Sequence, residues 1–318
     1  MQTVTHLKEF QDKPQFFWDF WQIYNHEKQD FDVLVLHARA DLVADEKHHF
    51  SSAIAHCKTQ DFKVMYDVSL NVFHSSTGWD NTSIWSGDVI WYKDRFLFFY
   101  TSRNLSDFYT QHIGLAVSQD MLDWSRQAVL ISADPTWYMT SSDSSENSIH
   151  AWRDPFIFEE AGSVYMLLGA KVRSLPANQR GAVAILRAVD DSLYRWEVLA
   201  PLYAPGCFGE IELPQLYKND LNQNILCFNS HAKHDTSLIE RKGGLYALNL
   251  TSYLLNGKII KSDLKMLAST QETGAYGFRI IPELDGVIVG FDAKNGGMVN
   301  TGIHTGFRHA GSFRYLFD

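Results

Sequence analysis

The sequence predicts an all-β protein folded as a five-bladed β-propeller. Two observations lead to this fold class. Short apolar or aromatic runs of strand length recur along the 318 residues, each bounded by polar or turn residues. Several runs are followed by a second strand of small and apolar residues, a polar turn that carries an aspartate, and then an aromatic residue. A unit that recurs about every 50 to 70 residues is typical of a propeller, because one small sheet cannot bury its faces until neighbouring sheets stack around an axis.

The apolar runs assign one strand to each blade in chain order: residues 31–36, 96–100, 164–168, 225–228 and 287–291. The second strands follow at residues 52–56, 113–118, 182–186 and, as a related copy, 244–248. Two stretches, 21–28 and 252–256, could form short helices. A two-sheet β-sandwich is the alternative architecture, since it is also built from short strands. No linker rich in Pro, Gly, Ser or charge divides the chain, so we expect residues 1–318 to form a single propeller domain.

The charge balance narrows the range of partners. The chain has 28 Lys and Arg against 37 Asp and Glu, a formal net charge of −9. Nucleic acid and anionic lipid are repelled by such a charge, so neither is an expected partner. The N-terminus lacks the apolar stretch of a secretory signal, and no later run reaches the ~18 apolar residues of a membrane span. Three cysteines, Cys57, Cys207 and Cys227, cannot all pair and show no Cys-x-x-Cys spacing, so we expect a soluble protein of the reducing cytoplasm.

Four acidic residues precede the apolar runs of successive blades: Asp19, Asp88, Asp154 and Glu212. The innermost strand of each propeller blade lines the central channel, so these acids could face one axis although they are far apart in sequence. Cleavage of a glycosidic bond requires one carboxyl group that protonates the leaving oxygen and a second that acts as nucleophile or base. A third acid could hold ring hydroxyls. The four acids are therefore candidates for a sugar-processing site.

Other residues near these acids have two possible interpretations. Four tryptophans could support a sugar ring: Trp18, Trp21, Trp85 and Trp152. Glu210 competes with Glu212, because residues two apart in a regular strand share a face, and Asp88 could equally be a structural hydrogen-bonding group. Five histidines are more typical of a polar surface than of a metal site: His48, His49, His56, His231 and His234. No phosphate cradle, Ser-His-Asp order or nucleotide fingerprint is present, so we expect no metal and no cofactor.

Four segments resemble motifs of the invertase and levansucrase clan. Residues 17–21, Phe-Trp-Asp-Phe-Trp, resemble the Trp-Asp segment of levansucrases, and residues 85–87 resemble their Trp-Ser-Gly motif. Residues 153–155 match the Arg-Asp-Pro triplet of levansucrases and invertases, and residues 212–214, Glu-Leu-Pro, resemble their Glu-x-Pro element. The order is that of the five-bladed glycoside hydrolase families 32 and 68 and, more distantly, family 43. The resemblance covers roughly residues 17–215 and implies that the propeller is a catalytic domain.

The resemblance implies a role for each matching residue. Asp19 corresponds to the nucleophile, Asp154 to a transition-state stabiliser that holds sugar hydroxyls, and Glu212 to the general acid and base. Arg153 corresponds to a substrate-binding residue, and the expected substrate-binding set is completed by Trp18, Trp85, Ser86 and Asp88. Carboxyl groups of Asp19 and Glu212 about 5 to 5.5 Å apart would imply retention of configuration, and about 6.5 Å or more inversion. Because a general acid must be protonated at rest, we expect a raised pKa for Glu212.

The expected function is that of a retaining β-fructofuranosidase-like glycoside hydrolase that cleaves fructosyl linkages of sucrose or short fructo-oligosaccharides. The same residues suit a levansucrase-like fructosyltransferase, whose acceptor is a sugar, or a family 43-like arabinofuranosidase or xylosidase, which predicts inversion. A non-catalytic sugar-binding propeller is the alternative from another class. The chain departs from the Asn-Asp-Pro-Asn-Gly element of invertases and has Leu213 where levansucrases have arginine, so the exact sugar and linkage stay open. Protein partners are not indicated by the sequence.

Overall fold

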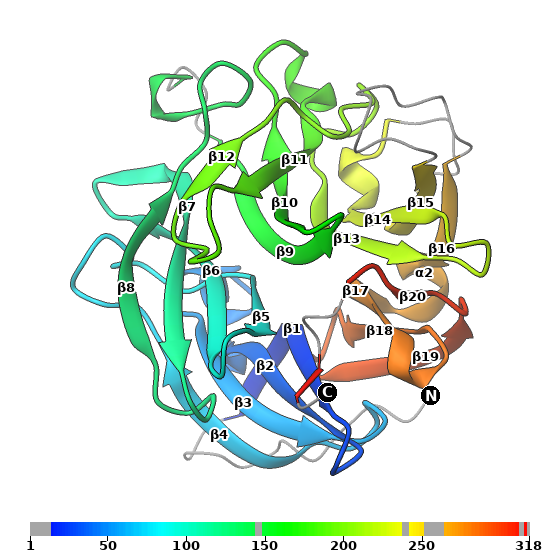
Figure 1. The fold of residues 1–318 in the computed structure, drawn as a ribbon. Helices are drawn as coiled ribbons and strands as arrows, with labels where there is room; N and C mark the ends of the chain where they lie inside the picture. The colour runs from blue at the N-terminus through cyan, green and yellow to red at the C-terminus, as the bar shows by residue number, and fades with distance from the viewer. Residues whose placement is uncertain (1–13, 144–147, 237–241, 251–263, 312–314, 317–318) are drawn as a thin grey trace.

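The computed structural model of the protein describes residues 14–143, 148–236, 242–250, 264–311 and 315–316. Within these ranges the chain forms five sheets, almost entirely antiparallel, arranged around a central axis (Figure 1). The predicted all-β, five-bladed propeller is therefore confirmed, and a two-sheet sandwich is excluded. No helix in the described part of the chain is long and apolar enough to cross a membrane.

Each blade takes consecutive strands from the chain, with the innermost strand first. The first three blades contain β1 (Gln15–Asn25), β2 (Asp30–Arg39), β3 (Ala53–Thr59) and β4 (Tyr66–Phe73); β5 (Gly87–Trp91), β6 (Phe96–Asn104), β7 (Asp107–Ser118) and β8 (Ser125–Ile131); and β9 (Trp152–Glu160), β10 (Ser163–Lys171), β11 (Gly181–Ala188) and β12 (Trp196–Val198). The last two contain β13 (Glu212–Lys218), β14 (Asn224–Ser230), β15 (Gly244–Leu250) and β16 (Lys265–Ser269), and β17 (Ala275–Ile281), β18 (Val287–Asp292) and β19 (Met298–His304). Two short strands are added at inner edges: β20 (Arg308–His309) beside β13, and β21 (Tyr315–Leu316) beside β1.

All five predicted apolar runs lie in the second strands of the blades, namely β2, β6, β10, β14 and β18. A second strand is paired along both edges and packed on both faces, so it is the strand whose sequence is most continuously apolar. The predicted runs of small and apolar residues lie in the third strands, β3, β7, β11 and β15. A helix at 21–28 was the wrong expectation, because residues 21–25 continue β1 and a turn leads into β2; the stretch 252–256 lies outside the described residues.

A repeated turn links the third and fourth strands of the first three blades. Phe62, Met121 and Leu193 adopt positive φ angles of 57°, 62° and 60°, and each is at most 1% exposed. In the second and third blades an indole N–H completes the turn, because Trp124 donates to the Met121 carbonyl and Trp196 donates to the Leu193 carbonyl. Positive φ is uncommon for apolar side chains and requires support from packing. The recurring aspartate and aromatic residues in the sequence therefore reflect one turn used three times.

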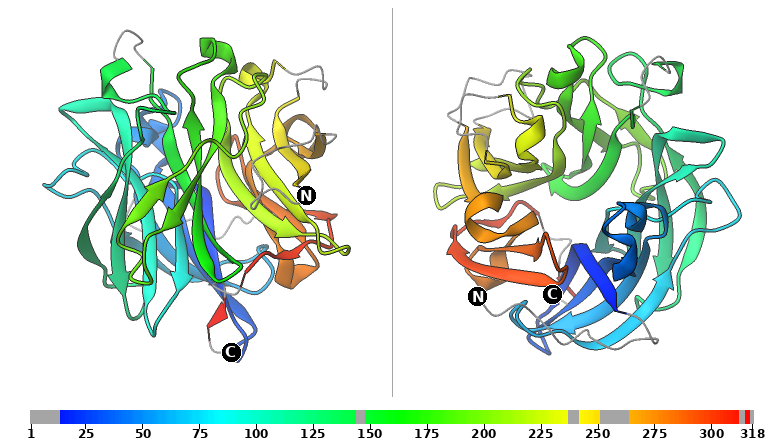
Figure 2. Two further views of the ribbon diagram at one scale, coloured as in Figure 1. Left: turned by 45° about the horizontal axis from the view of Figure 1, so that its top comes forward. Right: turned by 180° about the vertical axis from the view of Figure 1, so that it is seen from behind.

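The innermost strands β1, β5, β9, β13 and β17 surround the axis in chain order, as the views in Figures 1 and 2 show. The last blade returns to the first, and the Gly297 N–H donates a 2.8 Å hydrogen bond to the Phe17 carbonyl. Near the end of the chain, β21 pairs in parallel with β1 at Tyr24 and Asn25. The propeller is thus closed by contacts between segments from opposite ends of the sequence.

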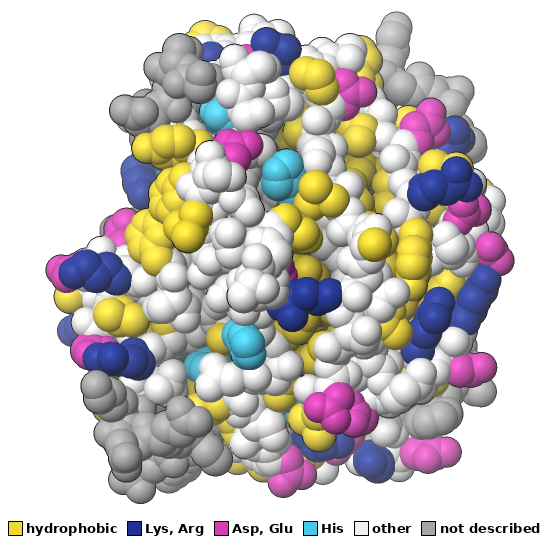
Figure 3. Space-filling model, turned by 90° about the vertical axis from the view of Figure 1, so that its left-hand side faces the viewer, with side chains coloured by type: hydrophobic (Ala, Val, Ile, Leu, Met, Phe, Trp, Pro, Cys, Tyr) yellow, Lys and Arg dark blue, Asp and Glu magenta, His cyan; other side chains and the backbone are white. Residues whose placement is uncertain are grey.

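The surface seen in Figure 3 carries basic and acidic side chains interspersed with polar and hydrophobic ones, and no continuous basic area covers that face.

Cys57, Cys207 and Cys227 are free thiols, and two of them are buried. The chain is therefore held together by strand pairing and packing between blades rather than by cross-links among these cysteines.

Candidate active site

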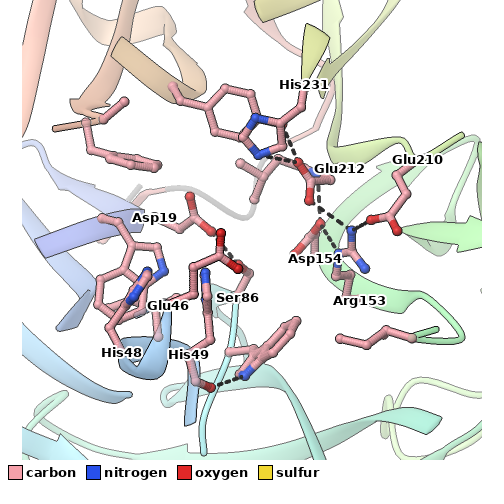
Figure 4. A pocket seen from close by; sticks show the side chains of 18 of the residues that line it. Asp19, Glu46, His48, His49, Ser86, Arg153, Asp154, Glu210, Glu212 and His231 are labelled. Atoms are coloured by element: carbon pink, nitrogen blue, oxygen red, sulfur yellow. Dashed lines mark hydrogen bonds and ion pairs between the residues drawn. The ribbon is translucent and has the colours of Figure 1, made fainter. Parts of the chain in front are cut away.

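A cavity of about 640 Å³ is lined by the inner strands β1, β9, β13 and β17 and by neighbouring loops (Figure 4). This volume is within the range of about 300 to 1,000 Å³ that is usual for small-molecule sites. Seven of the eight predicted site residues line the cavity: Trp18, Asp19, Trp85, Ser86, Arg153, Asp154 and Glu212. The structure therefore brings together the motifs that are dispersed in the sequence.

A β-bulge in each of three inner strands directs an acid toward the cavity. The register of β1, β9 and β13 shifts so that two residues oppose one residue of the second strand, at 18–19, 154–155 and 213–214. A bulge bends its strand and re-aims the adjacent side chains. Asp19 and Asp154 lie within bulges and Glu212 directly precedes one, and all three carboxyl groups point into the same space (Figure 4).

The bulges also explain the prolines of the Arg-Asp-Pro motif at 153–155 and the Glu-Leu-Pro motif at 212–214. Pro155 and Pro214 each stand at the second position of a bulge, where a strand tolerates a residue that lacks an N–H. Asp154 and Leu213 adopt positive φ angles of 60° and 48°, a conformation that persists only where surrounding contacts fix it. One such contact joins the two bulges, because the Leu213 N–H donates a 2.9 Å hydrogen bond to Asp154 Oδ2.

Asp88 is the one predicted site residue that does not line the cavity, which corrects its expected substrate-binding role. Strand β5 pairs with β6 without a register shift, so no bulge turns the Asp88 side chain toward the axis. Asp88 is fully buried, and its Oδ2 accepts a 2.7 Å hydrogen bond from the Ile157 N–H of β9. The carboxyl group therefore connects the second and third blades, which is the structural alternative that the sequence left open.

Asp19 lies in a tight space between β1 and β17. Its Oδ2 accepts a 2.7 Å hydrogen bond from the Ser86 hydroxyl. A Cβ atom on Gly277 would lie 2.5 Å from Asp19 Oδ1, so only glycine leaves room for the carboxylate. Burial and then the nearby Asp154 carboxylate raise the pKa of Asp19 to about 7, while the Ser86 hydrogen bond acts in the opposite direction.

Asp154 is held from several sides. Its backbone N–H donates to Thr101 Oγ1 at 3.2 Å, and Arg153 Nε lies 3.6 Å from its Oδ2. Burial raises the pKa of Asp154 to about 6, although the Arg153 guanidinium lowers it. Near neutral pH, Asp154 therefore presents a charged carboxylate in a position fixed by neighbouring backbone.

Glu212 has the opposite pKa shift from the one expected. Burial alone would raise its pKa, but the Arg153 guanidinium, the nearby His231 and the Tyr276 hydroxyl outweigh burial and lower it. Arg153 Nη2 donates to Glu212 Oε1 at 2.9 Å, and the Tyr276 hydroxyl donates to Oε2. His231 stacks on the Tyr276 ring, with centroids 3.8 Å apart, and its Nε2 lies 3.8 Å from Glu212 Oε2. The prediction of a raised pKa for Glu212 in the free protein is therefore wrong.

Arg153 connects the two competing glutamates. Its Nη2 donates to Glu210 Oε2 at 2.5 Å as well as to Glu212. Lys171 Nζ lies 2.7 Å from Glu210 Oε1, so Glu210 contacts two buried cations. Burial opposes ionisation of Glu210, but Arg153 and Lys171 hold its pKa far below the usual range. Glu210 is thus an acceptor that orients Arg153, and it is a poor candidate for a proton donor.

Several further expectations are corrected by the structure. Trp21 and Trp152 are fully buried in the hydrophobic core and do not line the cavity. Four histidines that were expected on a polar surface do line it: His48, His49, His231 and His234. Burial lowers the pKa of His49 to about 4, so its ring is neutral near pH 7. Among the described residues, no group of three His, Cys, Asp or Glu side chains is arranged to hold a metal ion.

Tyr276 is the contact of Glu212 that the sequence did not reveal. It precedes a fourth bulge, at residues 277–278 of β17, and so occupies the same position in its blade as Glu212 does in β13. Acidic residues precede the apolar runs of the other four blades, whereas this inner strand presents the phenol of Tyr276. The signal in the sequence is a polar residue of any kind at this position of the blade.

The comparisons with known proteins agree with the propeller fold. The sequence matches the model described as "Glycosyl hydrolases family 32 N-terminal domain" over residues 45–274, a range that includes Asp154 and Glu212. A search of curated proteins found no match.

Similar solved structures share the fold. The catalytic domain of Microbacterium saccharophilum K-1 beta-fructofuranosidase is 18% identical, with a TM-score of 0.66 over 95% of this chain and 81% of that one. Inulosucrase from Halalkalicoccus jeotgali, bound to kestose, is 19% identical, with a TM-score of 0.66 over 91% and 80%. The Y247A mutant of B. megaterium levansucrase is 16% identical, with a TM-score of 0.70 over 97% and 84%. Since the family model spans more than half of the chain, the protein belongs to glycosyl hydrolase family 32 and is an enzyme that acts on O-glycosyl bonds.

Proposed function

We propose that residues 1–318 act as one catalytic domain that hydrolyses fructosyl linkages of sucrose or short fructo-oligosaccharides with retention of configuration. The observation that carries the proposal is the convergence of Asp19, Asp154 and Glu212 from three blades on one cavity. Family membership favours glycoside cleavage, and the fructosyl specificity is supported by the beta-fructofuranosidase and the kestose-bound inulosucrase among the similar structures.

The roles follow from the environment of each carboxyl group. Glu212 gives a proton to the leaving glycosidic oxygen while Asp19 attacks the anomeric carbon and forms a covalent fructosyl ester. Glu212 then takes a proton from water, whose oxygen displaces Asp19 and releases fructose. Asp154, braced by the Leu213 N–H, accepts hydrogen bonds from sugar hydroxyls that strengthen in the transition state.

The distribution of protons is the demanding part of this scheme. In the free cavity Asp19 has the raised pKa and Glu212 the lowered one. The reactive form requires the opposite arrangement, with Asp19 ionised and Glu212 protonated. Bound sugar must therefore favour the proton on Glu212, where the glycosidic oxygen can accept it. Arg153 binds both Glu210 and Glu212, so a shift of Arg153 toward Glu210 would raise the Glu212 pKa and assist this exchange.

The test is product analysis with sucrose and inulin-type oligosaccharides. Hydrolysis releases glucose and fructose from sucrose in equal amounts, whereas transfer to another sugar releases glucose in excess. The initial anomer, followed by NMR, is β-fructofuranose if configuration is retained. Release of arabinose or xylose from the corresponding aryl glycosides, without release of fructose, would refute the proposal.

Substitution tests the named residues. Asp19→Asn and Glu212→Gln should each lower kcat by several orders of magnitude, because each removes a group that acts in the transition state. Matched controls are Asp191→Asn, whose side chain is 82% exposed, and Glu197→Gln, whose side chain is 50% exposed; both should retain activity. Unchanged turnover in Asp19→Asn or Glu212→Gln would refute the catalytic assignment.

A further inference from the structure

An aromatic cluster on the cavity rim has no role in the proposed chemistry. Phe50 stacks on Phe108 with ring centroids 5.6 Å apart and planes 12° apart, and Phe108 meets Tyr109 edge to face at 5.7 Å. Phe50 is 49% exposed and Tyr109 is 38% exposed. Large rings held in contact with one another at the surface are less usual than single exposed apolar side chains, and they indicate a site where something binds.

Arg103 lies beneath these rings as a buried cation without an acidic partner among the described residues. It is 1% exposed, and its Cζ lies 4.0 Å from the Phe108 ring centroid, 4.7 Å from that of Trp85 and 5.1 Å from that of Phe50. No acidic residue in the described part of the chain forms an ion pair with it, and burial lowers its pKa to about 10, so it stays charged at neutral pH.

The free donors of Arg103 lie on one edge of the guanidinium. Nη1 donates a long, 3.3 Å hydrogen bond to the Phe108 carbonyl, whereas Nε and Nη2 have no hydrogen-bond partner among the described residues. Nε and Nη2 form the side of the guanidinium that binds paired oxygen atoms. Buried polar groups normally have a partner, so this unsatisfied edge distinguishes the cluster from ordinary core packing.

The cluster is continuous with the catalytic cavity. Phe50, Trp85 and Arg103 line the cavity itself, and Phe108 and Tyr109 extend the same surface outward. Arg103 belongs to β6, the strand whose Thr101 hydroxyl accepts the hydrogen bond from the Asp154 N–H. A ligand held by Asp154 could therefore extend along this blade to the aromatic rings.

We propose that Phe50, Phe108 and Arg103 form an additional subsite for a distal sugar unit of an oligosaccharide. A sugar ring is suited to this surface, because its C–H face packs on the exposed aromatic rings, which the buried Arg103 guanidinium holds from beneath through its contacts with Phe50 and Phe108. When its fructosyl unit is bound at the carboxyl groups of Asp19, Asp154 and Glu212, a disaccharide extends less far toward Phe108 than a longer chain does. The subsite thus makes the enzyme prefer oligosaccharides to sucrose, an inference that depends on the proposed function.

The experiment compares chain lengths within each variant. kcat/KM is measured for sucrose and for an inulin-type tetrasaccharide, and binding of both sugars to Glu212→Gln protein is measured by calorimetry. In Phe50→Ala and Phe108→Ala we expect the tetrasaccharide-to-sucrose ratio of kcat/KM, and of affinity, to fall about tenfold, which corresponds to 1.4 kcal/mol. Phe50→Tyr, which keeps the ring, should restore the ratio. Leu221→Ala, which alters a leucine that is 77% exposed in the turn beyond the far end of β13, should leave it unchanged.

Two outcomes would overturn the inference. The first is an unchanged ratio in both alanine variants. The second is an equal loss for sucrose and tetrasaccharide together with a lower melting temperature, which would assign the cluster to packing alone. Failure of the proposed function has a different signature, because the unaltered protein would then release fructose from neither sugar.

Discussion

Replacement of Gly277 by alanine would displace the proposed nucleophile without changing its chemistry. The new Cβ atom would lie 2.5 Å from Asp19 Oδ1 and 2.5 Å from the nearest carbon of the Phe291 ring. Ordinary non-bonded contacts are about 3.5 Å, so the carboxylate or the strand must move by about 1 Å. A misplacement of about 1 Å can lower the rate about 100-fold. We expect kcat/KM for sucrose to fall by that factor.

The backbone strain of the substitution can be separated from the clash. Gly277 has a φ of 63°, where an alanine costs about 1 to 2 kcal/mol of folding free energy. Gly274 has a φ of 71°, but a Cβ atom there would meet no atom within 4 Å. Gly274→Ala is therefore a matched control, with the same strain and no contact with Asp19.

The assay is steady-state kinetics on both variants, with the folded fraction of each measured by circular dichroism and thermal melting. Gly274→Ala should keep its kcat/KM and lose only stability. The reasoning would be refuted if the two variants had similar kcat/KM values, because the contact with Asp19 would then have no effect on catalysis.

Three further results are expected. The kcat/KM profile should fall about tenfold per pH unit above about pH 7, because the Asp19 and Glu212 pair must retain one proton and the Asp19 pKa is about 7; constant activity up to pH 9 would contradict this. Ser86→Ala should move this limb to higher pH, because it removes the hydrogen bond that lowers the Asp19 pKa, and a shift to lower pH would exclude that role. Asp88→Ala should lower the free energy of unfolding in urea by about 1 to 3 kcal/mol, because the buried Ile157 N–H loses an acceptor, while kcat/KM is retained; lost activity in a stable protein would return Asp88 to the site.

The sequence predicts the blades well because each blade repeats a local pattern. Apolar runs alone predict the second strands, and small and apolar residues followed by the recurring turn predict the third strands. A strand that is buried on both faces has apolar residues at consecutive positions. This pattern lies within a few neighbouring residues, so it can be read from the sequence. The placement of Asp19, Asp154 and Glu212 on inner strands follows directly from this repeat.

The direction of each inner-strand side chain was less predictable. Asp88 and Asp154 have similar positions in the sequence pattern, but only β9 has a bulge beside its acid. Pro155 indicates that bulge, whereas Asp88 is followed by a regular strand. The pKa of Glu212 depends on Arg153 and Tyr276, which come from other blades, so no local pattern reports it.

The contact between Gly277 and Asp19 has a consequence for biosynthesis. At about 5 to 20 residues per second, a ribosome takes roughly 13 to 50 seconds to pass from residue 19 to residue 277. For most of this interval, from the synthesis of β4 onward, the strands of the first blade are present but its apolar inner strand lacks its contact with β17. An apolar strand edge exposed for this long is prone to aggregation. A nascent product that stops before β17 would hold every proposed catalytic carboxyl group and still lack a closed pocket.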